Sequence, residues 1–414
     1  MANVSSSNGL EKRPKLRFPG FDEPWKATAF GDIVHEFSNR TKVEDEDVLL
    51  SAAIEGMFLN TELFGHQRGA SNKGYKKIKY GTMVLSTQNL HLGNANVNQR
   101  FEHGMVSPAY KTYDISGCSI DLIAQWIKSD AAKRFFYNAT TVGASVCRRN
   151  VEWDTLYGQS LFLPSLPEQE KIANLLTLLS NRIEEQRQLI IALKKYKRGL
   201  SNSLFDRLSA ESESQLCIFG DMMTILQNNT FSRDNLSVGG NGVRNIHYGD
   251  VLIKYGAVLD LHSENVPVIN AEQDISKFSA LSYLRNGDVV FADTAEDYTV
   301  GKSTEIIGAE NIAALSGLHT IPCRPQGSFA PMYLGYYFNS DYFKKQLYPM
   351  IQGTKVSSIS KSEIIKTKII VPCLQEQARI SSIMSALDDR IDAAKHTTKD
   401  LIDLRSSLLQ QLFI

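Results

Sequence analysis

The sequence "LPSLPEQEKI" at residues 163–172 returns as "VPCLQEQARI" at residues 371–380. In both copies a proline ends an apolar run, and a Glu-Gln pair follows the next leucine. Proline is tolerated at the first turn of a helix, and acidic residues there are favoured by the helix dipole. The sequence therefore predicts two long helices that begin in the same way, with about half of the chain between them.

The likeness continues along both helices. Residues 166–205 align with residues 374–413 without a gap, and eleven of the forty positions are identical. Apolar residues recur at alternating steps of three and four, which is the seam of a coiled coil. We interpret this as a duplication, against the alternative of two unrelated amphipathic surface helices. The predicted helix-pair interface is Ile172, Leu176, Leu179, Ile183, Ile190, Leu193, Ile380, Met384, Leu387, Ile391, Leu401 and Leu408.

Charge predicts how the two helices pair. Parallel pairing in register would bring Arg182 against Arg390. Antiparallel pairing with full overlap brings the basic residues 194–195 opposite the acidic residues 388–389. We therefore expect an antiparallel coiled coil, although such exposed pairs contribute only about 0 to 1 kcal/mol each.

The duplication extends into the segments between the helices. "SDAAKRFFY" at residues 129–137 resembles "SDYFKKQLY" at residues 340–348, and "FGDIVHEFSNRT" resembles "FGDMMTILQNNT". The chain thus alternates globular unit and long helix, with predicted boundaries at 1–165, 166–208, 209–373 and 374–414. Because the two globular sequences otherwise differ, we expect a shared scaffold with two different surfaces.

Both globular units mix short strands with a few helices. Gly followed by Asp or Thr opens the β-rich runs "YGTMVLS", "YGDVLIKYG" and "NGDVVFA". Helical stretches are predicted around residues 120–133 and 331–346. Strands and helices do not alternate regularly, so the sequence predicts an α+β class with a pseudo-two-fold repeat.

Composition restricts the possible functions. With 43% hydrophobic and 22% charged residues, the 414-residue chain is typical of globular protein with more than one domain. No apolar run is long enough for a membrane helix and the start lacks a signal-peptide pattern, so we expect a cytoplasmic protein. The 45 basic and 45 acidic residues cancel. Any nucleic-acid site must therefore be local.

The sequence contains only incomplete matches to catalytic and metal-binding motifs. "GKST" at residues 301–304 resembles the end of a phosphate-binding loop, but Glu296 stands where that motif needs glycine. "SPAY" at residues 107–110 approaches the motif with which adenine methyltransferases hold a flipped base, but Ala109 replaces its second proline. The five cysteines are scattered, which argues against disulfides and structural zinc. We predict no catalytic residue and no metal site.

The acidic segment "FADTAED" raises one further possibility. Asp293, Glu296 and Asp297 could bind a metal ion. Such clusters are more often solvated loops, which is the interpretation that we favour.

Positive charge gathers in a few short segments. "HQRGASNKGYKKIKY" at residues 66–80 has five cations and no acid, interleaved with Gly, Asn and Tyr. Such a segment suits the phosphate backbone, with Asn and Gln able to reach base edges. "CRRN" at residues 147–150 and "GTKVSSISK" at residues 353–361 occupy matching places in the repeat. An ordinary solvated surface is the alternative for each segment alone, but the matching positions favour function.

The chain resembles the DNA-specificity subunits of Type I restriction-modification systems. The paired "LPEQEKIANLLTLLSNRIEEQRQLI" and "LQEQARISSIMSALDDRIDAAKHTT" helices carry the resemblance, together with "LRFPGFDEPWKATAFGDI", "VLSTQNL", "VSPAY", "GDVVFADTAEDYTVGKSTEI" and "GLHTIPCRP". It covers nearly the whole chain, and the order of these parts is distinctive.

The resemblance implies two target-recognition domains, each reading one half of a bipartite DNA site and held apart by the antiparallel coiled coil. It also implies two modification subunits, which bind S-adenosylmethionine, and restriction subunits, which use ATP and Mg. No cofactor is expected on this chain, whose lack of catalytic motifs fits that division of labour. A fused DNA adenine methyltransferase and a non-DNA coiled-coil scaffold are the alternatives.

Loop position and charge give the candidate DNA-binding residues. Asp297 could accept from a cytosine amino group while Lys302 holds a phosphate. The first-unit candidates are Arg68, Lys73, Lys76, Lys77, Arg148, Arg149 and Asn150. The second-unit candidates are Arg233, Lys254, Tyr298, Lys302, Lys355, Ser357 and Ser358.

Overall fold

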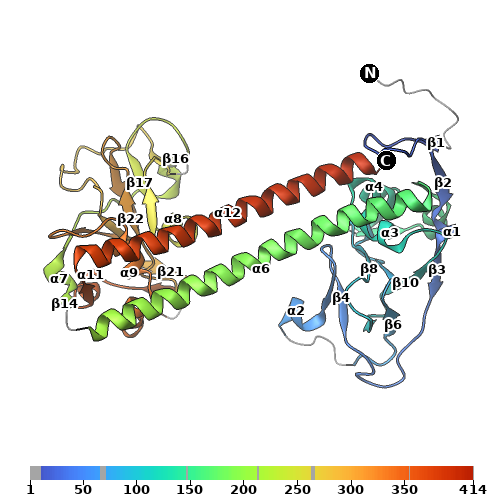
Figure 1. Cartoon of the computed structure of the whole chain (residues 1–414), viewed down its shortest axis with the longest axis horizontal. Coiled ribbons are helices and arrows are strands. Elements are labelled where there is room, and N and C mark those ends of the chain that lie inside the picture. Colours follow the sequence, from blue (N-terminus) through green and yellow to red (C-terminus); the bar gives the residue numbers. More distant parts are fainter. Residues whose placement is uncertain are drawn as a thin grey trace. The chain divides into compact units, whose positions relative to one another are not determined.

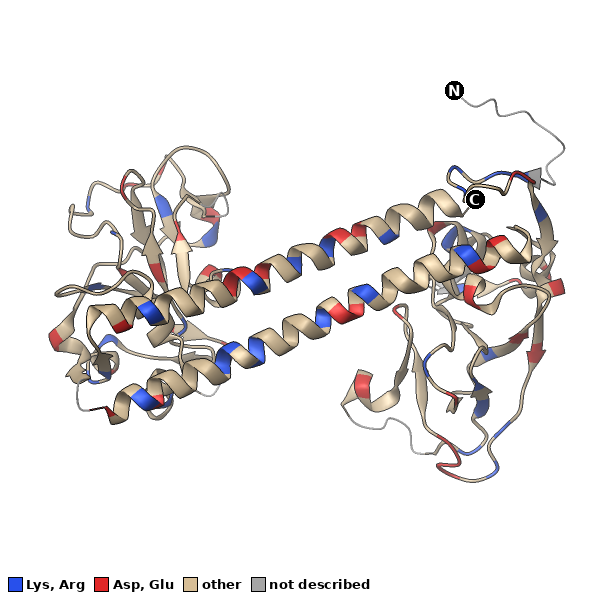
Figure 2. Cartoon of the chain, in the orientation of Figure 1, with Lys and Arg blue, Asp and Glu red and all other residues tan. Residues whose placement is uncertain are grey.

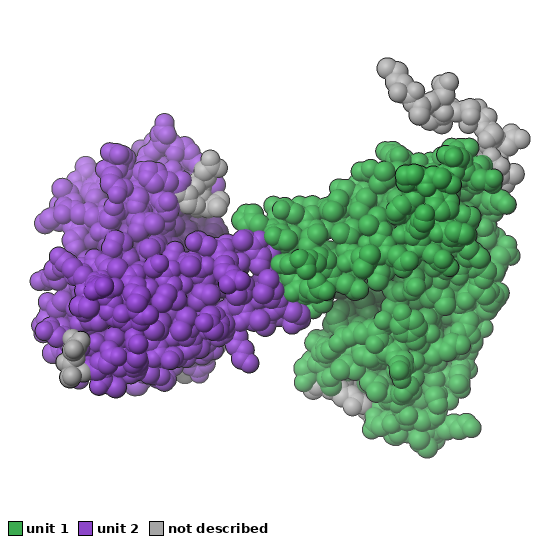
Figure 3. Space-filling model, viewed as in Figure 1, with its two compact units in different colours: residues 1–187, 396–414 green, residues 188–395 purple. Residues whose placement is uncertain are grey.

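The computed structural model describes residues 11–65, 71–145, 148–211, 214–262, 266–353 and 355–413. The chain divides into two compact units, which Figure 3 colours separately. Unit 1 comprises residues 1–187 and 396–414, and unit 2 comprises residues 188–395. Each unit therefore contains one globular body and a stretch of both long helices.

The two long helices are α6 (Leu166–Ala210) and α12 (Leu374–Leu412), seen in Figure 1. In unit 1, Arg405 Nε on α12 donates to Ser180 Oγ on α6 at 2.9 Å. In unit 2, Lys197 Nζ on α6 lies 2.5 Å from Asp388 Oδ1 on α12. The beginning of each helix thus lies beside the end of the other, which confirms the antiparallel pairing.

The register differs from the predicted one by less than one helical turn, because Asp388 meets Lys197 rather than Lys194 or Lys195. The surroundings of Asp388 explain the difference. Tyr336 Oη donates to Asp388 Oδ2 at 3.0 Å, and Lys197 Nζ lies 4.9 Å from the centroid of the Tyr336 ring. Contacts with the globular body of unit 2 therefore take part in setting this pair, which charge alternation along the helices alone did not predict.

The predicted helix-pair residues all lie in partly or fully buried positions. Ile172, Leu176, Ile183, Ile380, Met384, Leu387 and Ile391 are buried. Leu179, Ile190, Leu193, Leu401 and Leu408 are half-buried. Ile172 and Leu176 belong to the main hydrophobic core of unit 1, and Ile380 and Met384 belong to that of unit 2. The helix beginnings therefore pack on their own globular bodies as well as beside the other helix.

Unit 1 contains small, mostly antiparallel sheets with short helices around them. Its central sheet has the order β3 (Val34–Phe37), β10 (Tyr110–Ile115), β7 (Met83–Ser86), β8 (Ala95–Val97). Its other strands are β1 (Glu11–Lys12), β2 (Trp25–Ala29) and β13 (Ser160–Leu163) in one sheet, and the pairs β4 (Leu50–Ala52) with β5 (Met57–Leu59), β6 (Lys76–Lys79) with β9 (His103–Val106), and β11 (Thr140–Ser145) with β12 (Arg148–Val151). Its short helices are α1 (Phe30–Ile33), α2 (Asn60–Phe64), η1 (Leu90–Leu92), α3 (Ile120–Trp126), α4 (Asp130–Asn138) and α5 (Trp153–Gly158).

Unit 2 repeats this plan. Its central sheet has the order β15 (Met223–Ile225), β24 (Thr320–Pro325), β20 (Val289–Ala292), β22 (Ser303–Ile307), β18 (Val258–Asp260). A second sheet has the order β16 (Leu236–Ser237), β19 (Val268–Ile269), β17 (Arg244–Ile246), β23 (Ala314–Ser316), and two pairs join β14 (Gln215–Ile218) to β26 (Lys368–Val371) and β21 (Thr294–Ala295) to β25 (Ser357–Ser358). Its short helices are α7 (Phe219–Met222), η2 (Arg233–Asn235), α8 (Tyr248–Ile253), α9 (Tyr333–Phe338), α10 (Asp341–Leu347), η3 (Tyr348–Met350) and α11 (Lys361–Ile364).

The repeat is visible in equivalent backbone hydrogen bonds. Phe30 N–H, which opens α1, donates to Gln159 O at 2.8 Å, and Phe219 N–H, which opens α7, donates to Thr367 O at 2.8 Å. The predicted helical stretches appear as α3 with α4 in unit 1 and as α9 with α10 in unit 2. The α+β class and the internal repeat are confirmed.

The predicted β-rich run "YGDVLIKYG" is wrong, because residues 248–253 form α8. His247 Nδ1 accepts from Gly249 N–H at 3.2 Å and caps this short helix, while the buried Asp250 carboxylate is held by basic side chains. A short apolar run does not by itself distinguish a buried helix from a strand. The other two runs form β7 and β20 as expected.

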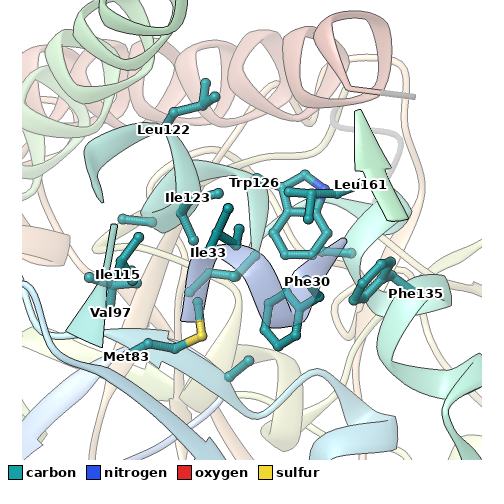
Figure 4. Packing of buried hydrophobic residues seen from close by; sticks show 14 of the residues in the cluster. Phe30, Ile33, Met83, Val97, Ile115, Leu122, Ile123, Trp126, Phe135 and Leu161 are labelled. Carbon is teal, nitrogen blue, oxygen red and sulfur yellow. The ribbon is translucent and has the colours of Figure 1, made fainter. Parts of the chain in front are cut away.

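Aromatic residues dominate the core of each body. In unit 1, Phe30, Trp126 and Phe135 converge (Figure 4), with ring centroids 5.5 Å apart for Phe30 and Phe135 and 5.2 Å apart for Trp126 and Phe135. Phe413, near the end of α12, adds an edge contact to Trp25 at 6.5 Å. The short helices, the central sheet and the end of α12 therefore share one core.

The repeated Glu-Gln pair fixes the start of α6. Gln169 Oε1 accepts from Ser119 N–H at 2.8 Å, and Gln169 Nε2 donates to Pro164 O at 2.8 Å. Glu168 is fully buried and receives two hydrogen bonds from Arg17, at 2.9 and 2.7 Å. These side chains attach the helix to the globular body, a role beyond the dipole effect predicted from the sequence.

Candidate nucleic-acid interface

The basic segment at residues 66–80 is only partly an exposed loop. Arg68 lies outside the described residues. Lys73 is exposed in the turn before β6. Among the residues that the structure describes, Lys73 has no ion-pair partner, so its ammonium group is open to solvent.

Lys76 and Lys77 point to opposite sides of β6. Lys76 is only 6% exposed, and its Nζ donates to Tyr110 O at 2.7 Å. Burial lowers the pKa of Lys76. Lys77 pairs with Glu46 at 2.8 Å, and this hydrogen bond raises the pKa of Lys77. In this structure Lys76 is therefore occupied inside the fold, whereas Lys77 lies at the surface with an acidic neighbour.

The second basic segment forms a β-ribbon. Arg148 opens β12, and Asn150 is exposed on the same strand. Arg149 Nε donates to Thr140 Oγ1 at 2.7 Å, and its guanidinium lies 4.2 Å from the centroid of the Tyr137 ring. The Arg149 guanidinium is thus held against the ribbon base, while Asn150 remains open to solvent.

In unit 2 the structure brings Arg233 and Lys254 together on one buried carboxylate. Asp250 is 1% exposed, with Arg233 Nη1 at 2.7 Å from Oδ2 and Lys254 Nζ at 2.9 Å from Oδ1. Burial acts to raise the pKa of Asp250, but the hydrogen bonds from the two cations outweigh it and the pKa is lowered. One negative charge therefore orients two cations that are each about half exposed, leaving a local positive excess.

Three aromatic side chains that the sequence did not predict lie beside this pair. His247 and Tyr248 have ring centroids 4.7 Å apart, and Tyr248 and His319 meet edge to face at 5.3 Å. Burial lowers the pKa of His247, and the charge of Arg233 adds to this effect. We call Arg233, His247, Tyr248, Lys254 and His319 the α8 patch. The segments "HYGD" and "GLHT", which contain His247, Tyr248 and His319, have no pattern that singles out these three residues.

His319 has an unusual backbone. Its φ of 54° lies in the left-handed region, where few residues other than glycine are found. Asp293 contacts both the backbone and the ring of His319. Its N–H donates to His319 O at 3.1 Å, and its Oδ1 lies 3.5 Å from His319 Nδ1. Strained exposed residues of this kind cluster at functional sites.

The serine candidates adjoin Asp293. Ser357 and Ser358 form β25, which pairs with β21 immediately after Asp293. Ile359 N–H donates to Asp293 O at 2.9 Å. Lys355 is exposed just before this strand. The segment at residues 355–358 is therefore connected through Asp293 to the His319 side of the α8 patch.

The remaining candidates are placed differently. Lys302 Nζ donates to Leu252 O at 2.9 Å, and burial lowers its pKa, with a contribution from Lys344. Tyr298 is 80% exposed. Asp297 accepts from Thr299 N–H at 2.8 Å, and the hydrogen bonds from Thr299 lower the pKa of Asp297. Lys302 thus supports the backbone of α8, and Tyr298 is the candidate here that is open to a ligand.

The chemistry of the α8 patch suits recognition. Guanidinium and ammonium groups bind phosphate, and a half-buried tyrosine between histidines offers hydrogen-bonding groups to a base. Figure 2 shows basic and acidic residues interspersed over both bodies, so positive charge is local in the view drawn. Within the described ranges, no group of three His, Cys, Asp or Glu side chains is placed to hold a metal ion. None of the described helices is long and apolar enough to span a membrane.

One family model matches part of the chain. The profile described as "Type I restriction modification DNA specificity domain" matches residues 220–403, which include most of unit 2. The specificity subunit of the type I restriction enzyme MjaVIII of Methanocaldococcus jannaschii is 22% identical over 428 aligned positions, covering 96% of this chain and 93% of that protein.

Two solved structures share the fold. The crystal structure of the type I restriction-modification system S subunit from M. genitalium aligns with a TM-score of 0.55 at 15% identity, covering 97% of this chain and 99% of that one. A chain from a study of complex assembly and conformational transition of the type I R-M system aligns with a TM-score of 0.56 at 18% identity, covering 95% and 98%. The fold is therefore shared along both chains.

Proposed function

We propose, on the premise that this chain is a member of the type I restriction-modification specificity-subunit family, that it reads a bipartite, asymmetric DNA sequence for a larger modification and restriction complex. The chain is a non-catalytic subunit, and its task is sequence-specific binding. Each of its two units reads one half of the target.

The internal repeat is the observation that carries this proposal. Two bodies with the same scaffold each receive one helix beginning and one helix end, as the equivalent Phe30 and Phe219 contacts illustrate. Equivalent scaffolds present equivalent loops to DNA, while different loop sequences read different bases. Two separate words within one target follow from one duplicated fold.

The α8 patch is our candidate reader in unit 2. Arg233 and Lys254 are anchored by Asp250, which holds their charges in place without covering them. Tyr248 and His319, whose rings are in contact, add hydrogen-bonding groups to this patch. In unit 1 the exposed Lys73 and Asn150 are the corresponding candidates, and in unit 2 Tyr298, Lys355 and Ser358 extend the surface.

The helical segments have the length needed for a spacer. The shorter helix, α12, has 39 residues and measures about 58 Å at 1.5 Å per residue, and half-sites one turn of DNA apart lie about 34 Å from centre to centre. We infer that the helix pair sets the number of base pairs between the two half-sites.

The proposal includes the partners and the location. Two modification subunits supply S-adenosylmethionine and the methyl-transfer chemistry. Restriction subunits supply ATP- and Mg-dependent cleavage. The working complex is cytoplasmic, where it meets DNA. The isolated chain needs no cofactor of its own for recognition.

Two binding experiments separate this proposal from its alternatives. The complex of the chain with its modification subunit is titrated with double-stranded DNA at moderate salt, and a specific complex is expected. Absence of DNA binding favours a non-DNA scaffold. Equilibrium dialysis of the isolated chain with S-adenosylmethionine tests the fused-methyltransferase alternative, and we expect no binding.

A further inference from the structure

Unit 1 contains a groove of about 730 Å³ between its globular body and the two long helices. The walls are α3, the first half of α6, the last part of α12 and the turn between β4 and β5. Apolar residues, including Ile54, Ile183 and Ile402, line it together with polar ones. The volume is far larger than a single small ion requires.

Arg405 lines this groove from α12, and none of the described residues is an acidic partner for it. Its Nε donates to Ser180 Oγ at 2.9 Å and its Nη2 donates to Gln125 Oε1 at 2.7 Å. Both acceptors are neutral, and these bonds use two of the five N–H groups of a guanidinium. Burial lowers the pKa of Arg405, as expected for a cation removed from water without compensation.

Lys128 is a second cation of the same kind. Its Nζ donates to Ile54 O at 2.9 Å and to Asn96 Oδ1 at 2.6 Å, again neutral acceptors. Burial lowers the pKa of Lys128 to about 8, Arg405 adds to this effect, and Glu55 opposes it. Over the described part of the chain, neither Lys128 nor Arg405 has a carboxylate as an ion-pair partner. Two cations thus share one groove without an acid bonded to either.

The repeat supplies an internal comparison. In the gapless helix alignment Arg405 corresponds to Lys197, and Ser180 corresponds to Asp388. In unit 2 the equivalent groove holds the Lys197–Asp388 pair at 2.5 Å. Unit 2 therefore provides a carboxylate for its cation, whereas unit 1 has a neutral serine at that position.

We propose that the unit-1 groove is a docking site for an acidic side chain of the modification subunit, whose carboxylate binds Arg405 and Lys128. The inference rests on the proposed function, because that function supplies the protein partner. Asp388 shows that a carboxylate suits a cation at this position of the scaffold. The size of the groove, and the apolar side chains of Ile54, Ile183 and Ile402 among its mostly polar walls, favour a protein segment over a free anion.

The same reasoning predicts that the two ends of the chain differ. In unit 2 the cation is already neutralised by Asp388, so an acidic side chain gains less there. Charged hydrogen bonds of this type change affinity by about tenfold or more. A modification subunit at unit 1 should therefore depend on the Arg405 charge, and one at unit 2 should not.

The test gives unit 1 the carboxylate that unit 2 has at the corresponding position. The Ser180→Asp variant places a carboxylate of the chain itself beside Arg405, and Ser180→Asn is its neutral control of similar size. The full-length chain is titrated with the modification subunit by calorimetry, and native mass spectrometry gives the stoichiometry. We expect Ser180→Asp to weaken one of the two binding steps by about tenfold, and Ser180→Asn to leave both nearly unchanged.

Labelling of Lys128 with an amine-reactive reagent provides a second readout. The modification subunit should protect Lys128 in the wild-type chain, and millimolar succinate or inorganic phosphate should not. If succinate or inorganic phosphate alone protects Lys128 equally well, the groove binds small anions, and the proposal of a protein carboxylate is overturned. If Ser180→Asp binds the modification subunit as tightly as the wild type does, this inference is overturned, while the proposed function stands. Failure of every variant, the wild type included, to bind the modification subunit overturns the proposed function itself.

Discussion

Gln377 Oε1 accepts a hydrogen bond from the backbone N–H of Ala330 at 2.9 Å, while Gln377 Nε2 donates to Pro372 O at 2.8 Å. In unit 1 Gln169 makes the same two bonds, to Ser119 and Pro164. Each glutamine joins the start of a long helix to the segment that leads into the aromatic helix of its own unit. The repeated glutamine is therefore the joint between body and helix.

Replacing this glutamine should loosen one joint. Gln377 is 1% exposed, so Gln377→Ala leaves Ala330 N–H and Pro372 O without their partner, at a cost of about 1–3 kcal/mol. Hydrogen exchange should become faster around residues 330–338 and at the start of α12. The exposed Gln375 provides the control, because Gln375→Ala removes no such bond. Equal exchange in the two variants would show that the joint does not stabilise unit 2.

A buried acid in unit 2 should make stability depend on pH. Glu305 is 2% exposed and accepts from Met332 N–H at 2.6 Å and Gly335 N–H at 2.8 Å. Burial raises the pKa of Glu305 from 4.5 to about 7, although these hydrogen bonds oppose the shift. The folded state thus binds the proton more tightly, so this contribution to stability is present below pH 4.5 and is lost as the pH rises through about 7.

The Glu305→Gln variant removes that titration. We expect the Tm of the wild type minus the Tm of the variant to decrease as the pH rises from 4.5 to 8. Thermal unfolding of both proteins in matched buffers measures it, and other titrating groups cancel in the difference. A Tm difference that stays constant over this range would mean that Glu305 has an ordinary pKa in the folded chain.

The α8 patch should contribute to DNA affinity through its positioned charges. Arg233→Gln in the complex with the modification subunit should weaken binding and reduce the slope of log K against log salt by about one unit. Asp250→Asn should act in the same direction, because it releases Arg233 and Lys254 from their anchor. Lys195→Gln, at an exposed position on α6, is the charge-matched control. If the control lowers the slope as much as Arg233→Gln, the patch has no special part in binding.

Substitutions at Lys73 and Lys76 should separate an effect on DNA binding from an effect on stability. Lys73→Met removes an exposed cation, so it should weaken DNA binding without changing Tm. Lys76→Met removes the buried donor to Tyr110 O, so it should change Tm and leave the salt slope unchanged. Fluorescence titration with DNA and thermal unfolding provide the two readouts. The opposite assignment would place Lys76 at the DNA surface.

The helices and the repeat were predictable because they are written in local patterns. The period of the apolar residues gave the coiled-coil seam, and Pro372 and Gln377 marked where α12 begins. The register was not predictable, because the Lys197–Asp388 pair also contacts Tyr336, which lies far away in the sequence. Exposed charges are individually too weak to determine such a choice.

The candidate site was predictable only in part. Lys76 shares its strand face with Ile78, since side chains alternate along a strand, and both are buried. That alternation in "KKIK" was available in the sequence but was given less weight than charge. The grouping of Tyr248 with His319 depends on the fold, because α8 and the turn before β24 are separated by more than 60 residues.

The most direct measurement is the mapping of adenine methylation on DNA from cells that express this chain with its modification subunit. The account predicts one asymmetric motif made of two different short words with a fixed gap between them. A single continuous motif, or two identical words, would contradict the claim that two divergent copies of one fold read the two halves of the target.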